Sequence, residues 1–306
     1  MVKITARGEK IMREPIGMTL QEDYLYCEKI IKKHSKSFYY AFSKLPKEKA
    51  QAIYAIYTFC RYADDTVDTV KDSAEQRLNI TKLENELKAF ENGNAVDTPM
   101  WRALADVFER FDMDIEPYYD QLKGQKMDID FVSPETLGDL EEYSYYVAGT
   151  VGLMLLPIIA KENKEAAKAS AISLGVAMQI TNILRDVGED WKDNNRVYLP
   201  NQILSQEKFS KEDLIRGQVN DSFIRIWENL AHRAESLYDS FRKEIQLFDK
   251  ESQLPVLISA DVYRGILNAV RRNQYDCLQT RNYVSPLEMN RIQRESKRFF
   301  NRLAEG

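Results

Sequence analysis

Apolar side chains recur with the spacing of an α-helix along almost the whole chain. Tyr24, Cys27 and Ile31, for example, lie on one stripe of a helix expected over residues 20–34. No segment keeps a two-residue alternation for long, and Gly (12 residues) and Pro (9 residues) are scarce among the 306 residues. We therefore expect an all-α fold, because an all-β chain needs many Gly- and Pro-rich turns.

The same pattern divides the chain into successive helices. A break is expected around Lys33–Phe38, Pro46 opens the next helix, and Pro200 falls in a connection. No repeat of solenoid length and no linker-like tract separates the helices, so we expect a single domain. After residues 20–34, the predicted helices cover about 46–68, 74–91, 99–112, 116–130, 133–145, 148–160, 164–190, 211–216, 220–249, 252–280 and 286–303.

Bulk composition excludes several classes of protein. The formal net charge is −5 and no basic block is present, which argues against nucleic acid as a partner. Three widely spaced Cys residues without a CxxC pair favour a reducing compartment, so we expect a cytoplasmic protein. Neither of the two His residues forms an ExxH or HExxH motif, which argues against di-iron and zinc-protease sites.

Two segments bear on targeting. Residues 1–17 lack the apolar stretch of a signal peptide, and we expect an N-terminal extension, either disordered or left over from expression, ahead of a domain over residues 18–306. The longest apolar run, Val151–Ala160, contains Pro157 and is too short to span a bilayer. We therefore expect no membrane anchor, and peripheral membrane contact at most.

Two acidic stripes lie late in apolar helices. Tyr57, Arg61, Asp64 and Asp68 fall within roughly 60° of one another on a helical wheel. At i,i+4 spacing, Asp64 and Asp68 repel each other by roughly 0.2–0.5 kcal/mol without a counter-ion, and the helix dipole disfavours them further.

The second stripe has the same character. Gln179, Asn182, Asp186 and Asp190 occupy a band about 80° wide, opposite an apolar face. Either stripe alone could be a solvated acidic face. Together they favour a site for a hard cation, because a set of oxygen ligands without His or Cys suits Mg²⁺.

Cationic and hydroxyl side chains near these stripes suit a phosphate ligand. Arg61 and Arg185 are candidate anion partners, and the expected break at Lys33–Phe38 offers backbone N–H groups and hydroxyls. The alternatives are that Ser35 or Ser37 caps the next helix and that His34 is a structural side chain.

Four segments, in this order, resemble the trans-isoprenoid squalene/phytoene synthase family. They are KHSKSFYYAF (33–42), RYADDTVD (61–68), YSYYVAGTVG (143–152) and QITNILRDVGED (179–190). The resemblance extends from about residue 20 to 285 and is strongest to the bacterial dehydrosqualene (diapophytoene) synthases of carotenoid biosynthesis. It implies a single isoprenoid-synthase helical bundle around a large central cavity, which agrees with the helical pattern.

The resemblance also implies a reaction. Two prenyl diphosphates condense head to head through a cyclopropylcarbinyl diphosphate, with two or three Mg²⁺ ions per site and release of diphosphate. For a dehydrosqualene synthase it implies two farnesyl diphosphates, no NADPH, and transient membrane contact for product release. The oligomeric state stays open.

Residue roles follow from matching positions in the family motifs. The Mg²⁺ ligands implied are Asp64, Asp68, Asn182, Asp186 and Asp190, and the catalytic residues are Asp64, Asp68, Asp186, Asp190 and Tyr143. The diphosphate contacts implied are His34, Ser35, Lys36, Ser37, Tyr57, Arg61, Gln179, Arg185, Tyr263 and Arg281. The wall of the prenyl channel is implied at Tyr143, Val147 and Gly152. Because the cation must be kept from water, the apolar side chains of Phe38, Phe42, Leu153, Leu156 and Ile180 are further candidates for the channel.

Several alternatives remain at this point. The same chemistry on the twenty-carbon substrate would give phytoene, and squalene formation would need NADPH. A non-catalytic helical scaffold would predict eroded acidic motifs, whereas both motifs are intact. Either the released diphosphate or Tyr143 could take the final proton. The stretch Gly124–Asp128 departs from the GMxxD-like pattern of many relatives, and we assign it no role.

Overall fold

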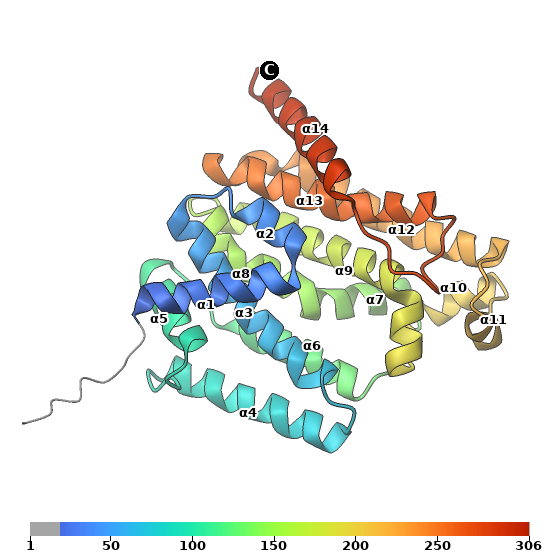
Figure 1. Ribbon diagram of the computed structural model, residues 1–306, viewed down its shortest axis with the longest axis horizontal. Coiled ribbons are helices and arrows are strands. Elements are labelled where there is room, and N and C mark those ends of the chain that lie inside the picture. The colour runs from blue at the N-terminus through green and yellow to red at the C-terminus, as the bar shows by residue number, and fades with distance from the viewer. Residues whose placement is uncertain (1–18, 306) are drawn as a thin grey trace, which may run out of the picture.

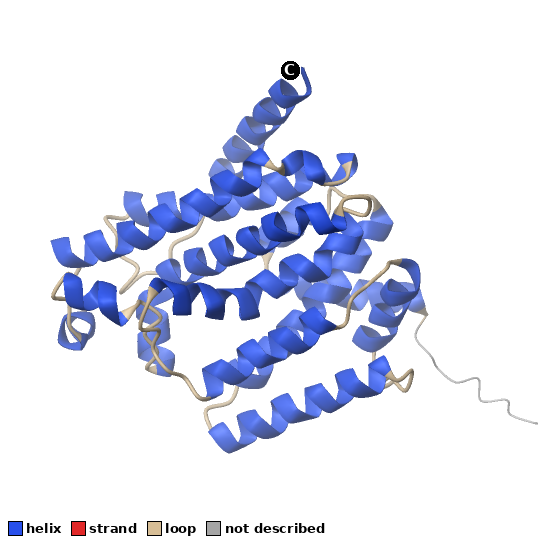
Figure 2. Ribbon diagram, turned by 180° about the vertical axis from the view of Figure 1, so that it is seen from behind, coloured by secondary structure: helices blue, strands red, loops and turns tan. Residues whose placement is uncertain are grey.

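The structure, a computed structural model, describes residues 19–305. These residues form helices joined by loops, and they contain no strands (Figures 1 and 2). The expected all-α fold is confirmed, while the extension expected over residues 1–17 lies outside the described residues. The α-helices are α1 (Leu20–His34), α2 (Lys36–Phe42), α3 (Lys47–Asp68), α4 (Ser73–Glu91), α5 (Pro99–Arg110), α6 (Glu116–Ile129), α7 (Leu137–Ser144), α8 (Thr150–Ile159), α9 (Lys164–Asn194), α10 (Asn201–Gln206), α11 (Lys211–Arg216), α12 (Asp221–Lys243), α13 (Lys250–Arg272) and α14 (Pro286–Glu305). A π-helical turn covers Tyr145–Gly149 and a 3₁₀ turn covers Ile245–Leu247.

Helices α3 and α9 are the centres of the two halves of the bundle. Helix α3 contacts α1, α4, α5 and α6, whereas α9 contacts α7, α12 and α13. Helix α8 contacts both and joins the halves (Figure 1). Since the two acidic stripes lie on α3 and α9, the fold brings them to the same interior space.

Side-chain caps fix several helix starts. The Thr19 hydroxyl accepts a hydrogen bond from the Glu22 amide, and the Glu22 carboxylate accepts one from the Thr19 amide, which is a capping box. Thr136 and Asp139 form another at α7. This cap makes α7 begin at Leu137, so the predicted start near residue 133 is corrected.

Backbone geometry explains the largest error in the predicted helices. The helix expected over residues 252–280 ends at Arg272, because Gln274 and Tyr275 have φ angles of 54° and 60°. Such left-handed angles cannot continue a right-handed helix. Residues 273–285 instead form a non-helical connection that lies against α9, where the Gly188 amide donates to the Cys277 carbonyl. Elsewhere, α12 ends at Lys243 rather than near 249, Ser35 alone interrupts α1 and α2, and α10 was not predicted.

The small residues of YSYYVAGTVG allow α8 and α9 to pack closely. A Cβ atom added to Gly152 would lie 2.8 Å from the Ala171 carbonyl carbon, and one added to Gly175 would lie 2.7 Å from that of Ala148. The π turn just before α8 carries the bond from the Thr150 amide to the Tyr145 carbonyl. Among residues 19–305, no helix combines the length and apolar character needed to span a bilayer.

Candidate active site

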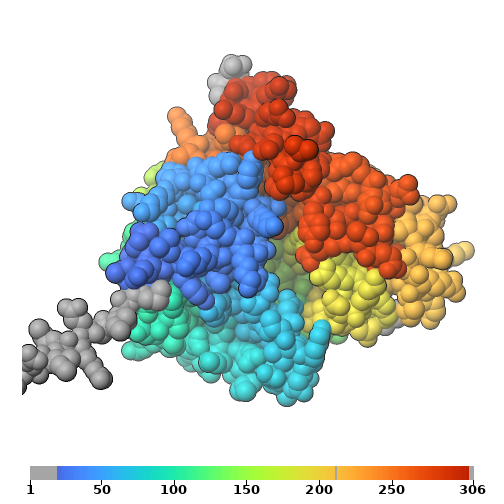
Figure 3. All heavy atoms as spheres, viewed as in Figure 1, coloured from blue at the N-terminus to red at the C-terminus, as the bar shows by residue number. Residues whose placement is uncertain are grey.

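A large cavity opens between the two halves of the bundle. Its volume is about 1420 Å³, against roughly 300–1,000 Å³ for ordinary small-molecule pockets. In Figure 3 its mouth is the hollow between the N-terminal helices in blue and the segment before α14 in red. All the metal, diphosphate and channel residues predicted from the motifs line this cavity. Three further channel candidates, Leu153, Leu156 and Ile180, do not, because they lie on the faces of α8 and α9 that turn away from it.

The first acidic stripe enters the cavity from α3. Asp64 is half-buried, and its Oδ1 accepts a hydrogen bond of 2.8 Å from Gln125 Nε2 on α6. Burial, followed by repulsion from Asp68, raises the pKa of Asp64 to about 7. The Arg61 guanidinium pairs with Asp65, the neighbouring carboxylate. The Asp64 carboxylate therefore has a neutral hydrogen-bond donor but no direct cationic partner.

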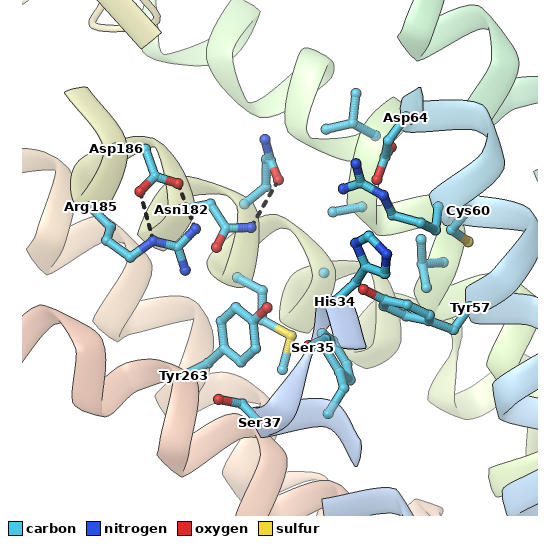
Figure 4. Close-up of a pocket in the computed structure, with 18 of the residues that line it drawn as sticks. His34, Ser35, Ser37, Tyr57, Cys60, Asp64, Asn182, Arg185, Asp186 and Tyr263 are labelled. Atoms are coloured by element: carbon cyan, nitrogen blue, oxygen red, sulfur yellow. Dashed lines mark hydrogen bonds and ion pairs between the residues drawn. The ribbon is translucent and has the colours of Figure 1, made fainter. Parts of the chain in front are cut away.

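The second stripe enters from α9 on the opposite side (Figure 4). Arg185 holds Asp186 through two bonds, Nε to Oδ1 at 2.8 Å and Nη2 to Oδ2 at 2.5 Å. Arg281, from the connection before α14, reaches Asp186 Oδ2 at 3.4 Å and Glu189 Oε1 at 2.7 Å. Burial and the charge of Asp186 raise the pKa of Asp190 to about 8.

The donor set of the two stripes fits Mg²⁺. Each stripe contains a carboxylate whose charged form is disfavoured by burial and by its neighbour, so a cation would relieve the repulsion. The buried Asn182 Oδ1 has no hydrogen-bond partner, and an amide oxygen is a ligand for hard cations. Within residues 19–305, no three His, Cys, Asp or Glu side chains converge into one complete ion site. The ligands would have to be shared with a bound diphosphate, as is usual for Mg²⁺.

The junction of α1 and α2 forms the rim beside these stripes. Ser35 is the non-helical residue between the helices, and it lines the cavity together with Tyr263 on α13. His34 and Ser37 lie on the same side of the pocket (Figure 4). Burial, followed by the charge of Arg61, lowers the pKa of His34. A neutral imidazole and hydroxyls at a helix junction suit phosphate oxygens.

Comparison with known proteins agrees with this geometry. The family model described as squalene/phytoene synthase matches residues 31–288. The chain belongs to the squalene/phytoene synthase family. It is 39% identical to the 4,4'-diapophytoene synthase of Staphylococcus haemolyticus over 92% of this chain and 98% of that relative. It is 37% identical to the chloroplastic phytoene synthase 1 of Solanum lycopersicum, over 87% of this chain and 65% of the relative.

A solved structure extends the similarity to three dimensions. A dehydrosqualene synthase crystallised with a ligand superposes with a TM-score of 0.88 at 42% identity, covering 92% of this chain and 98% of that chain. The predicted family and the isoprenoid-synthase helical fold are therefore confirmed.

Aromatic and apolar side chains line the inner part of this synthase's cavity. Phe38 stacks on Phe42 with ring centroids 5.5 Å apart and lies 5.2 Å from Tyr263. Val147 and Gly152 contribute the wall from the π turn and α8. One end of the cavity is thus charged and the other is apolar.

Sequence reasoning missed a buried network below the acidic stripes. Asp128 on α6 accepts hydrogen bonds from the Tyr143 hydroxyl at 3.0 Å and the Tyr198 hydroxyl at 2.7 Å. Arg196 donates 2.8 Å to the Asp128 carbonyl and lies 3.8 Å from its carboxylate. The sequence feature that could have indicated this network is the stretch Gly124–Asp128. It departs from the family pattern, and the sequence analysis assigned it no role. The structure places its Gln125 and Asp128 on the cavity wall.

Proposed function

We propose that this chain condenses two farnesyl diphosphates head to head into dehydrosqualene (4,4'-diapophytoene), in carotenoid biosynthesis. The observation that carries this proposal is one cavity with two facing acidic stripes at one end and apolar aromatic walls at the other. Such a cavity suits two substrates that each have a diphosphate head and a hydrocarbon tail. The similarity to diapophytoene synthase over nearly the whole of both chains supports the fifteen-carbon substrate.

The polar end of the cavity serves departure of the diphosphate. In the first step the allylic C–O bond breaks and its electron pair leaves with the diphosphate. Lys36, His34 and the two serines at the α1–α2 junction would contact its oxygens, with Arg61 and Arg185 nearby. Mg²⁺ held by Asp64, Asp68, Asn182, Asp186 and Asp190 would neutralise the charge that develops on the leaving group.

The apolar end protects the carbocation. The double bond of the second substrate attacks the allylic cation, and loss of a proton closes the cyclopropane ring of the intermediate diphosphate. A second ionisation, rearrangement and proton loss give the linear product. Phe38, Phe42 and Tyr57 present aromatic faces and exclude water, which would otherwise trap the cation as an alcohol. The reaction ends with the loss of a proton and not with the addition of a hydride, so it needs no NADPH.

The hydrogen bonding of Tyr143 bears on the final proton. Its hydroxyl donates to Asp128, and burial raises its pKa well above the ordinary value. We therefore assign Tyr143 as a neutral side chain that shapes the cavity, and the released diphosphate as the acceptor of the proton.

Product analysis tests the proposal. Purified protein is incubated with Mg²⁺ and either farnesyl or geranylgeranyl diphosphate, with and without NADPH, and the hydrocarbon mass is measured. We expect a thirty-carbon product that forms equally without reductant. A forty-carbon product alone would indicate a phytoene synthase, and a product that requires NADPH would indicate a squalene synthase.

Two carboxylate variants test the assignment of the site. We expect Asp64→Ala and Asp186→Ala to lose turnover while their helical circular dichroism persists. Glu109→Gln, which removes an exposed carboxylate on α5, is the matched control and should keep activity. Unfolding of either site variant would indicate a structural role instead.

A further inference from the structure

Helix α14 is anchored to α13 by its inner face. Ile292 and Ser296 are buried, and the Ser296 hydroxyl donates a 2.6 Å hydrogen bond to Asp261 on α13. The Arg242 guanidinium lies 4.2 Å from the centroid of the Phe299 ring. These contacts fix which side of α14 faces outward.

The outer face of α14 is cationic. Leu287, Arg291, Arg294, Arg298 and Arg302 fall within roughly 80° of one another at 100° per residue, opposite Ser296. All five are exposed, and we call the four arginines the arginine ridge. Such a ridge stands out in a chain with a net charge of −5.

The ridge has few internal counter-ions. Arg291 lies 3.4 Å from Glu288 and 4.0 Å from Glu295. The other three arginines form no ion pair with any residue in the described part of the chain. Their charge is therefore available to an external polyanion.

Apolar side chains lie next to the ridge at the mouth of the cavity. Leu287 is 83% exposed and Tyr283 is 68% exposed, which is unusual for side chains of this size. Val284 and Met289, in the same segment, line the cavity itself. Figure 1 shows α14 rising away from the body of the molecule just after this segment.

We propose that the arginine ridge, with Leu287 and Tyr283, docks this protein on an anionic lipid bilayer beside the mouth of its cavity. The combination of a cationic stripe with exposed apolar residues is typical of helices that lie in a membrane interface. A nucleic acid would not need the exposed leucine in line with the arginines. The reason for such docking rests on the proposed function. A thirty-carbon hydrocarbon is insoluble in water, so the mouth of the cavity that releases it should face lipid.

Vesicle binding by the full chain tests the surface. Vesicles of equal parts phosphatidylglycerol and phosphatidylcholine are compared with pure phosphatidylcholine at low and high salt. The ridge variant is Arg294→Gln with Arg298→Gln. Its matched control is Lys82→Gln with Lys88→Gln, which removes two exposed positive charges from α4, far from α14 (Figure 1).

We expect binding to anionic vesicles only. Each arginine removed should weaken it roughly fivefold, so the ridge variant should lose roughly 25-fold and the α4 variant little. Leu287→Gln should weaken binding roughly tenfold, and this loss should persist in high salt, where the contribution of the arginines is screened.

Three outcomes would overturn the proposal: binding to neither vesicle, equal binding by the ridge and α4 variants, or ridge-dependent binding to duplex DNA without vesicle binding. Turnover is measured separately in detergent solution, where the ridge variant should match the parent protein. Ridge-dependent vesicle binding by a protein that makes no thirty-carbon product would support the surface and contradict the proposed function.

Discussion

Replacement of Gly188 by alanine is expected to disturb both stability and the candidate site. Gly188 lies inside the RDVGED motif of α9, where the connection before α14 crosses the helix, and its amide donates 3.0 Å to the Cys277 carbonyl. An added Cβ would lie 2.5 Å from the carbonyl carbon of Leu278 and 2.7 Å from its Cα. Backbone atoms cannot swing aside as a side chain can, so the whole connection must move.

The sign of the effect distinguishes this contact from ordinary helix propensity. Glycine to alanine within a helix is favourable by about 1 kcal/mol, whereas overpacking a tight contact costs about 1–3 kcal/mol. Because the added Cβ would clash with backbone atoms, we expect the upper end of that cost and a net loss of about 2 kcal/mol. The matched control is Gly138→Ala in α7, where the nearest atom to a new Cβ would be Thr136 Oγ1 at 3.5 Å. That variant should be neutral or slightly stabilised.

Two measurements on the same variants check the argument. Urea unfolding followed by circular dichroism gives the free energy of unfolding, and steady-state kinetics gives kcat/KM. The displaced connection carries Arg281, which bonds Asp186 and Glu189, so turnover should also fall. Arg281→Gln should lower turnover without the loss of stability. A Gly188→Ala protein that is more stable than its parent and fully active would refute the reasoning.

Three further predictions follow from the acidic stripes. Gln125→Leu removes the hydrogen bond that α6 donates to the Asp64 carboxylate. We expect this variant to have a kcat roughly tenfold lower and to need a higher Mg²⁺ concentration for half-maximal activity. An unchanged Mg²⁺ dependence would contradict this role of Gln125. Mg²⁺ at 100 times its dissociation constant should stabilise the protein by about 2.7 kcal/mol, measured as a thermal shift that Asp186→Asn abolishes. The pKa values of Asp64 and Asp190 are raised from 3.8 to about 7 and about 8, so the folded state holds protons that the unfolded chain releases. Protein from which a chelator has removed all metal should therefore lose stability as the pH rises from about 4 to about 8. Saturating Mg²⁺ should flatten this dependence of stability on pH.

Helical periodicity was enough to predict the all-α fold, and the spacing of the carboxylates was enough to predict which sides of α3 and α9 face the cavity, whereas most other site residues were predicted from the family resemblance. Both kinds of signal are local: apolar stripes locate the helices, and i,i+4 carboxylates mark the cavity-facing side of α3 and α9. The end of α13 was not predictable in this way. Gln274 and Tyr275 are unremarkable in sequence, and their left-handed geometry lets the connection turn back to α9.

The hydrogen-bond network around Asp128 shows that local sequence signals were also too limited to predict the whole candidate site. Its partners Tyr143, Arg196 and Tyr198 lie 15, 68 and 70 residues away along the chain. No spacing rule connects residues so far apart, and only the tertiary fold brings them together. Gln125 was missed for a related reason, since its importance depends on the position of Asp64 on a different helix.

The acidic stripes cost stability that the rest of α3 and α9 must offset. Each stripe places neighbouring carboxylates near the end of a helix, where both mutual repulsion and the helix dipole are unfavourable. On the opposite face of α3, Phe59 packs edge-on against Trp101 and Tyr118, with ring centroids 5.9 and 5.0 Å apart. On α9, Gly175 permits backbone contact with the turn before α8. Substitutions in these anchoring contacts should destabilise the protein and impair activity together. Neutralising Asp64 or Asp190, whose charged forms are disfavoured by burial, should instead stabilise the metal-free protein and remove its activity. That opposition of sign is expected of a site whose charges are placed for a bound cation and diphosphate rather than for the fold.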